Sequence, residues 1–146
     1  MYFYGCVDHT SSLELVFDDD ATLKIPASYY LEYSLPDSNP GFIKNRQGTC
    51  IQFLKGGVFS PEGIIENFSE LLERDTVGNR VRVLCRDDWE GRVFVGLIIW
   101  DTTSKITSSG NLQYPGVLLS CEVFSRQEET EVLQILRSVK VLNEKK

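Results

Sequence analysis

The sequence predicts an α+β fold, in which an antiparallel β-sheet is flanked by two main helices. Short stretches with alternating apolar residues predict strands, and two longer stretches carry apolar residues at helical spacing. The strands follow one another in groups and do not alternate with helices, as they would in a doubly wound parallel sheet. The chain has 146 residues, of which 42% are hydrophobic and 25% charged, and this predicts a single domain over residues 1–146.

A hairpin is predicted near the start of the chain. Residues 13–17 alternate between apolar and polar side chains, and residues 22–25 return as the second strand. Between them, Asp18, Asp19 and Asp20 are expected to form the turn, because three consecutive carboxylates do not suit a sheet.

The remaining strands are separated by two long segments rich in turn residues, residues 35–48 and 101–113, which are predicted to be loops. A shorter turn is expected over residues 87–91. The strand over residues 92–100 is apolar on both faces, so it is expected at the centre of the sheet. The other strands are predicted over residues 29–33, 49–54, 80–86 and 116–124.

The first main helix is predicted to begin after Ser60, the expected N-cap, with Pro61 in the first helical position and Gly78 closing the segment. Its apolar stripe comprises Ile64, Ile65, Phe68, Leu71 and Leu72.

The second main helix is predicted to follow a capping box that runs from Ser125 to Glu128. Its core face comprises Val132, Leu133, Ile135, Leu136 and Val139. The residues expected to be buried in the core of the whole domain include Phe68, Val83, Val95, Leu97, Ile99, Leu119 and Leu136.

No catalytic motif is found, so we expect a protein that is not an enzyme and that uses no cofactor. His9 is the only histidine, and with Cys6 it could supply half of a zinc site, but no second half is evident. The four cysteines lack Cys-x-x-Cys spacing, and they are expected to be structural thiols and not metal ligands. Phosphate-binding loops are absent from the sequence.

The formal net charge of −6 argues against a nucleic-acid-binding protein and suits a basic protein partner. Arg80, Arg82, Arg86 and Arg92 gather on one predicted hairpin. They could contact an acidic loop or nucleic acid, but a solvated sheet face is the more ordinary interpretation of this group.

An acidic stripe is predicted on the first helix, where Glu62, Glu66, Glu70 and Glu73 lie roughly opposite the apolar stripe without a lysine among them. The stripe is either an ordinary solvated face or a docking surface for a basic partner. The partner-binding residues expected on the second interpretation are Asp18, Asp19, Asp20, Glu62, Glu66, Glu70, Asp87, Asp88, Trp89 and Glu90. Trp89 is included because an aromatic residue at a turn tip can anchor an interface.

No apolar run approaches the roughly 20 residues that a membrane-spanning helix needs. No signal peptide is evident either, so a cytoplasmic location is expected, or a periplasmic one if a signal has been removed.

The C-terminal half resembles the closing segment of Mog1/PsbP-like domains. A long apolar strand over residues 91–100 is followed by Tyr114 and Pro115, a second strand, and an amphipathic helix that ends in the residues Ile135, Leu136, Arg137, Ser138, Val139 and Lys140. The resemblance implies an antiparallel sheet with flanking helices.

This chain is small and acidic and has no catalytic motif, and in these respects it also resembles bacterial immunity proteins, which neutralise secreted antibacterial toxins. The expected function is therefore neutralisation of a toxin by direct binding, and the expected partner is a basic cognate toxin. The alternative is a non-catalytic accessory or ligand-binding scaffold of the Mog1/PsbP type.

Overall fold

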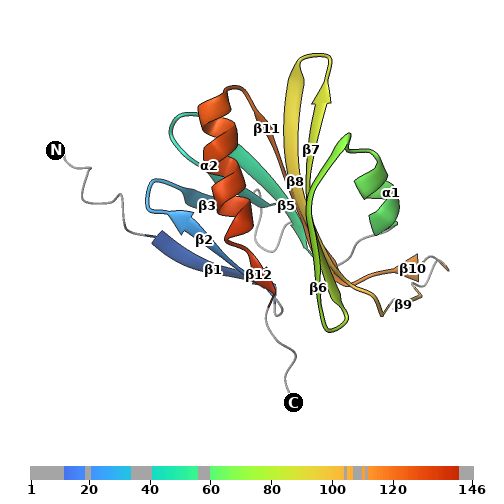
Figure 1. Ribbon diagram of the computed structural model, residues 1–146. Helices are drawn as coiled ribbons and strands as arrows, with labels where there is room; N and C mark the ends of the chain where they lie inside the picture. The colour runs from blue at the N-terminus through green and yellow to red at the C-terminus, as the bar shows by residue number, and fades with distance from the viewer. Residues whose placement is uncertain are drawn as a thin grey trace.

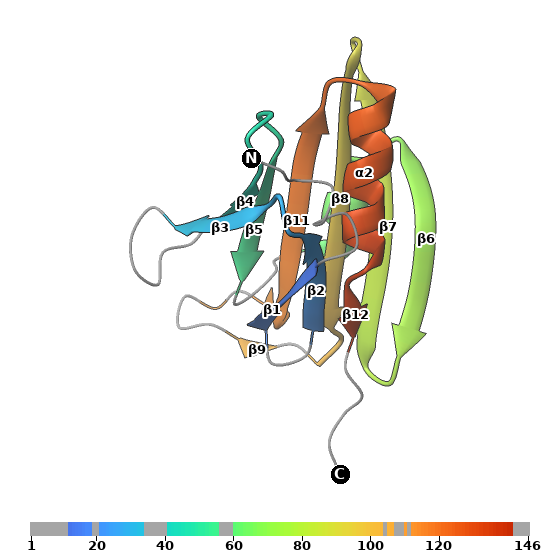
Figure 2. The same ribbon diagram turned by 90° about the vertical axis from the view of Figure 1, so that its left-hand side faces the viewer.

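The computed structural model describes residues 12–18, 21–33, 41–55, 60–103, 105–106, 110 and 112–141. The largest unit is one antiparallel sheet of seven strands (Figures 1 and 2). In spatial order its strands are β3 (Tyr30–Tyr33), β4 (Gly41–Lys44), β5 (Cys50–Lys55), β11 (Gly116–Val123), β8 (Arg92–Asp101), β7 (Arg80–Trp89) and β6 (Glu70–Val77).

The other described strands belong to two smaller sheets. The three-stranded one contains β1 (Ser12–Asp18), β2 (Ala21–Pro26) and β12 (Lys140–Val141), and the two-stranded one contains β9 (Lys105–Ile106) and β10 (Leu112–Gln113). The predicted hairpin at the start of the chain is confirmed, because β1 pairs with β2 antiparallel and Asp18 lies opposite Ala21.

The large sheet is covered on both faces, by different elements. Helix α2 (Arg126–Arg137) and the three-stranded sheet lie on one face, and helix α1 (Pro61–Glu66) lies on the other (Figures 1 and 2). The central strand β8 has six consecutive buried residues, Val95 to Trp100, because alternate side chains enter the apolar cluster under α2 and the one under α1. The prediction of a central strand covered on both sides is confirmed.

The predicted core residues are buried with one exception. Val83, Leu97 and Leu136 are among those without exposed surface. Phe68 is only half buried, and its ring lies against Gly96 on β8, where a Cβ atom would come within 2.9 Å of the ring. A glycine at this position therefore allows the segment that follows α1 to approach the sheet closely.

Helix α2 begins as predicted. The Ser125 hydroxyl accepts a hydrogen bond from the backbone N–H of Glu128 at 3.0 Å. The Glu128 carboxylate reaches back to the N–H of Phe124, one residue before the N-cap, at 2.6 Å. The first bond satisfies a donor that the first turn of a helix leaves unpaired, and the second fixes the residue before the N-cap.

Two arginines of β7, Arg82 and Arg86, contact the ends of α2, which corrects the interpretation of the arginine group as a solvated sheet face for these two members. Arg82 is only 7% exposed and donates to the carbonyl oxygens of Val139 (3.1 Å), Leu136 and Arg137 (both 3.4 Å). At the other end, Arg86 Nε donates to Glu129 at 2.6 Å.

The spacing of these contacts follows from the geometry of the two elements. Arg82 and Arg86 are separated by four residues, or about 13 Å along a strand. Glu129 and Arg137 are separated by eight residues, or about 12 Å along a helix. The helix therefore fits between its two arginine contacts, with its C-terminal end at Arg82.

The predicted fold class is wrong, because the molecule is mainly β. Helix α1 has six residues, and the rest of the predicted first helix forms the eight-residue strand β6. The reason lies in β7, whose residues Val81 to Cys85 are all buried and need backbone partners on both sides. Strand β8 satisfies one side and β6 the other, with Val77 paired to Arg80 across a tight turn at Gly78 and Asn79.

Smaller corrections concern loops and turns. The predicted loop over residues 35–48 contains strand β4, and residues 105–106 and 112–113 of the second loop pair as short strands. Ser60 precedes α1 as predicted, but it has a left-handed backbone and its side chain makes no capping bond. No helix in the described part of the chain is long and apolar enough to cross a membrane.

Candidate protein-binding surface

One end of the large sheet, here called the apical end, combines the tip of the β7–β8 hairpin, the junction between β11 and α2, and the loop between β4 and β5. These segments comprise residues 87–92, 123–126 and 45–49 (Figure 2). The candidate surface is built from them.

The hairpin tip is tighter than predicted. The strands pair as far as Trp89 and Arg92, so the turn contains only Glu90 and Gly91. Both have positive φ values, 52° and 81°, as a type I′ turn requires. A glutamate in this conformation costs roughly 1 kcal/mol, and backbone strain of this kind concentrates at functional sites.

Trp89 stands at this tip with 55% of its surface exposed. The strand beneath it is braced by Ser69. The Ser69 N–H donates to the Asp87 carboxylate, and the Ser69 hydroxyl accepts from the N–H of Asp88, both at 3.3 Å. Trp89 is thus an exposed aromatic side chain on a supported two-residue hairpin.

The acidic residues predicted on one helical stripe do not form it. Glu62 and Glu66 lie on α1, whereas Glu70 lies on β6. Glu62 pairs with Arg74 at 2.7 Å, and this hydrogen bond lowers the pKa of its carboxyl. Glu70 lies 3.6 Å from Arg86. The stripe is therefore largely compensated, and of these three only Glu66 makes no ion pair with a residue that the structure describes.

The predicted acidic segments converge only in part. Glu70 pairs across the strands with Arg86, next to Asp87, so the start of β6 lies beside the hairpin tip. Asp18 lies at the opposite end of the molecule, because it is opposite Ala21, which pairs with β12 after the C-terminal end of α2. Asp19 and Asp20 lie outside the described residues.

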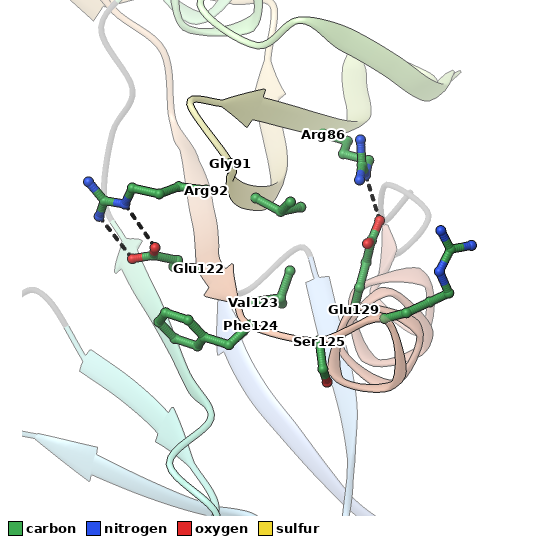
Figure 3. Close-up of a pocket in the computed structure, with 10 residues that line it drawn as sticks. Arg86, Gly91, Arg92, Glu122, Val123, Phe124, Ser125 and Glu129 are labelled. Atoms are coloured by element: carbon green, nitrogen blue, oxygen red, sulfur yellow. Dashed lines mark hydrogen bonds and ion pairs between the residues drawn. The ribbon is translucent and has the colours of Figure 1, made fainter.

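A hollow of about 340 Å³ opens beside the hairpin tip (Figure 3). Two ion pairs stand on opposite sides of it, Arg92 with Glu122 at 2.9 Å and Arg86 with Glu129 at 2.6 Å. Its full lining comprises Arg86, Gly91, Arg92, Val93, Glu122, Val123, Phe124, Ser125, Arg126 and Glu129.

Phe124 is the most important residue that the sequence analysis missed. It is 77% exposed, more than any other large apolar side chain in the described part of the chain. The bond from its N–H to Glu128 and the adjoining helix cap fix its backbone. A sequence signal exists, because an apolar residue before an N-cap usually packs on an apolar residue at the fourth helical position, and here that position is Glu129.

A second hollow, of about 510 Å³, lies on the other side of Phe124 between α2 and the loop at residues 45–49. Its two carboxylates already accept short hydrogen bonds from internal donors. Tyr29 donates to Glu131 and the Thr49 hydroxyl donates to Glu128, both at 2.6 Å. Burial, together with the bond to Glu131, raises the pKa of Tyr29. These carboxylates therefore stabilise the position of α2.

The described cysteines are free thiols, and in the part of the chain that the structure describes no cluster of side chains could hold a metal. Burial raises the pKa of Cys85 to about 11 and that of Cys121 to about 12, so both thiols are protonated at neutral pH. Cys50 is half buried. Cys6 and His9 lie outside the described residues.

Comparisons with known proteins give little further information. No family model matches the chain, and no curated protein matches it. One solved structure that is similar is LpqN of Mycobacterium tuberculosis, described as involved in cell envelope biogenesis. It shares 12% sequence identity over 90% of this chain and 91% of its own, with a TM-score of 0.40. A likeness at this level supports no argument about fold or function, and the resemblance to Mog1/PsbP-like domains stays a prediction.

Proposed function

We propose that this chain is an immunity protein, which neutralises a secreted antibacterial toxin by binding it through the apical end. The observation that carries the proposal is the pair of exposed aromatic residues there, Trp89 and Phe124, each on a supported backbone. Exposed aromatic residues of this kind are the usual energetic anchors of protein interfaces.

The fixed backbone beneath Trp89 and Phe124 matters as much as the two side chains. Binding costs free energy for every side chain and loop that must be ordered, and a preformed surface avoids part of that cost. The two-residue turn beneath Trp89 and the helix cap beside Phe124 already fix the backbone of both residues. Inhibition by such a surface requires no catalytic group.

Charge supports a basic partner. The chain has a formal net charge of −6, and Asp88 and Glu90, which flank Trp89 in the hairpin, are both exposed. Charges at the rim of an interface mainly accelerate association with a partner of opposite charge. Toxins that act on nucleic acids have basic surfaces and are thus the partners that this surface suits.

The test is co-expression with a candidate toxin encoded next to this chain. The wild-type chain should restore growth and bind the purified toxin in calorimetry. A double variant, Trp89→Ala with Phe124→Ala, should lose most of the affinity and the protection. Val77→Ala, which truncates an exposed apolar residue at the far end of β6, is the matched control and should protect like the wild type.

A double variant that protects as well as the wild type would exclude the apical end as the toxin-binding site. A wild-type chain that neither binds nor protects would argue for the alternative, a non-catalytic scaffold.

A further inference from the structure

The hollow in Figure 3 differs in charge from the rest of the protein. Three arginines line it, Arg86, Arg92 and Arg126, against two glutamates, so its lining has a net charge of +1 in a chain whose net charge is −6. Two of the arginines are already paired with the two glutamates. The unbalanced charge therefore belongs to Arg126.

The position of Arg126 destabilises its own helix slightly. It occupies the first position of α2, where the helix dipole favours acidic residues and disfavours a cation by a few tenths of a kcal/mol or more. Its side chain is exposed and forms no ion pair with any residue that the structure describes. By contrast, Arg137 in the last turn suits the dipole and pairs with Glu73 at 2.6 Å.

The remaining lining defines the kind of group that the hollow suits. Val123 is buried and Val93 half buried, and with the exposed ring of Phe124 they form the apolar part of the lining that Arg126 shares. Glu122 and Glu129 repel any anion, but they repel a doubly charged phosphate about twice as strongly as a singly charged carboxylate. A single carboxylate attached to an apolar segment meets all of these conditions.

We propose that this hollow receives an aspartate or glutamate side chain of the protein partner, with Arg126 pairing to its carboxylate and Phe124 packing on an apolar residue beside it. The inference rests on the proposed function and specifies its partner further. The toxin surface that fits the apical end is basic opposite Asp88 and Glu90, and it carries one acidic residue next to an apolar one opposite Arg126.

A first test needs no toxin. Two peptides, acetyl-Leu-Asp-amide and acetyl-Leu-Asn-amide, are titrated into the full-length protein while the side-chain N–H resonances of the arginines are followed by NMR. The aspartate peptide should shift the Arg126 resonance saturably and bind at least about tenfold more tightly than the asparagine peptide. The Phe124→Ala variant should bind the aspartate peptide more weakly.

In the same experiment, Arg126→Gln should remove the preference for aspartate, because it keeps a polar side chain of similar length without the charge. The inference is overturned if the two peptides bind alike, if Arg126→Gln binds the aspartate peptide as the wild type does, or if neither peptide causes a saturable shift.

A second test uses the toxin complex. Arg126→Glu should weaken binding by about tenfold or more, and less so at high salt. Lys24→Glu changes the net charge equally at an exposed site on β2 and should have little effect. If Arg126→Glu binds normally while the double aromatic variant does not, this inference fails and the proposed function stands. If no toxin binds the wild-type chain, the function fails and the peptide titration alone decides the role of the hollow.

Discussion

The two ends of helix α2 use the same kinds of side chain in different ways. At its C-terminal end, Arg82 is buried, and Glu73 joins it to Arg137 with contacts of 3.1 and 2.6 Å. At the apical end, the aromatic residues Trp89 and Phe124 and the cation Arg126 are exposed. One end is saturated with internal partners, whereas the other retains groups that an external partner can use.

This difference explains why charge alone was a poor guide to the site. Among the residues that the structure describes, most arginines and glutamates pair with a residue of another element, and Arg82 makes the largest number of such bonds. The residues that remain available to an external partner are those that are exposed and that make no stabilising contact within the described part of the fold. The four predictions below test that distinction, in order of decreasing expected effect.

Arg82→Ala should have the largest effect, a loss of about 3 kcal/mol in the free energy of unfolding. The substitution leaves carbonyl oxygens at the end of α2 without their donor and removes one partner of Glu73. Urea unfolding followed by circular dichroism measures the loss. Arg126→Ala is the matched control and should change the free energy by less than about 0.5 kcal/mol. Equal losses in the two variants would contradict the distinction between the two ends.

Ser125→Ala should cost about 1 kcal/mol, because the hydroxyl that accepts from Glu128 at the first turn of α2 is lost. The same denaturation experiment measures it. The neighbouring substitution Gln127→Ala, at an exposed position of the same turn, should be close to neutral. A variant at Ser125 as stable as the wild type would mean that the cap does not support Phe124.

Acidification should act on the C-terminal end of α2. The hydrogen bond from Arg137, helped by Arg82, holds the pKa of Glu73 below its ordinary value. A carboxyl with a lowered folded-state pKa stabilises the fold above its unfolded-state pKa and loses that contribution as the pH falls through the folded value. Between about pH 5 and pH 3, the free energy of unfolding should therefore fall less steeply for Glu73→Gln than for the wild type.

The expected difference is smaller than that of either substitution above, because the Glu73 carboxylate is partly exposed and screened by solvent. Glu66→Gln serves as a control, since Glu66 is exposed and unpaired within the described residues. Its pH dependence should follow the wild type. Identical slopes for wild type and Glu73→Gln would show that the carboxylate does not stabilise this end.

Trp89→Ala and Phe124→Ala should have the smallest effects on folding, within about 0.5 kcal/mol each. Both side chains are mostly exposed, so little apolar contact is lost. Thermal unfolding measures the change, and Leu84→Ala, which truncates a fully buried residue of β7, provides the contrast. A large destabilisation by either aromatic substitution would assign that residue to the core instead of to an interface.

Local signals in the sequence predicted much of the sheet correctly. The alternation of β7, the doubly apolar β8 and the capping box of α2 all depend on neighbouring residues, and these elements are confirmed. The first helix failed because its apolar spacing also suits a strand with a bulge, which is present between Leu71 and Glu73. The competing signal was the Gly78-Asn79 pair, a typical two-residue hairpin turn.

The candidate site was only partly predictable for the same reason. Trp89 was identified because its turn is local in sequence. Arg82 was misjudged, since the end of α2 that it contacts lies more than fifty residues further along the chain. The bonds to Val139 and Leu136 span 57 and 54 residues. Phe124 was assigned to the end of a strand, because its exposure depends on where α2 turns away from the sheet.

Strand β6, the outermost strand beside β7, also bears on how copies of the protein meet. Two copies could pair antiparallel through β6 about a two-fold axis. Each residue of β6 and the residue facing it in the second copy would then have to lie on the same face of the joined sheet. Side chains alternate along the strand, so the axis would pass through a residue. Near the centre of the strand that residue is Glu73, Arg74 or Asp75, and each would face an identical charge. The edge therefore opposes this pairing of two copies through β6, even at high concentration.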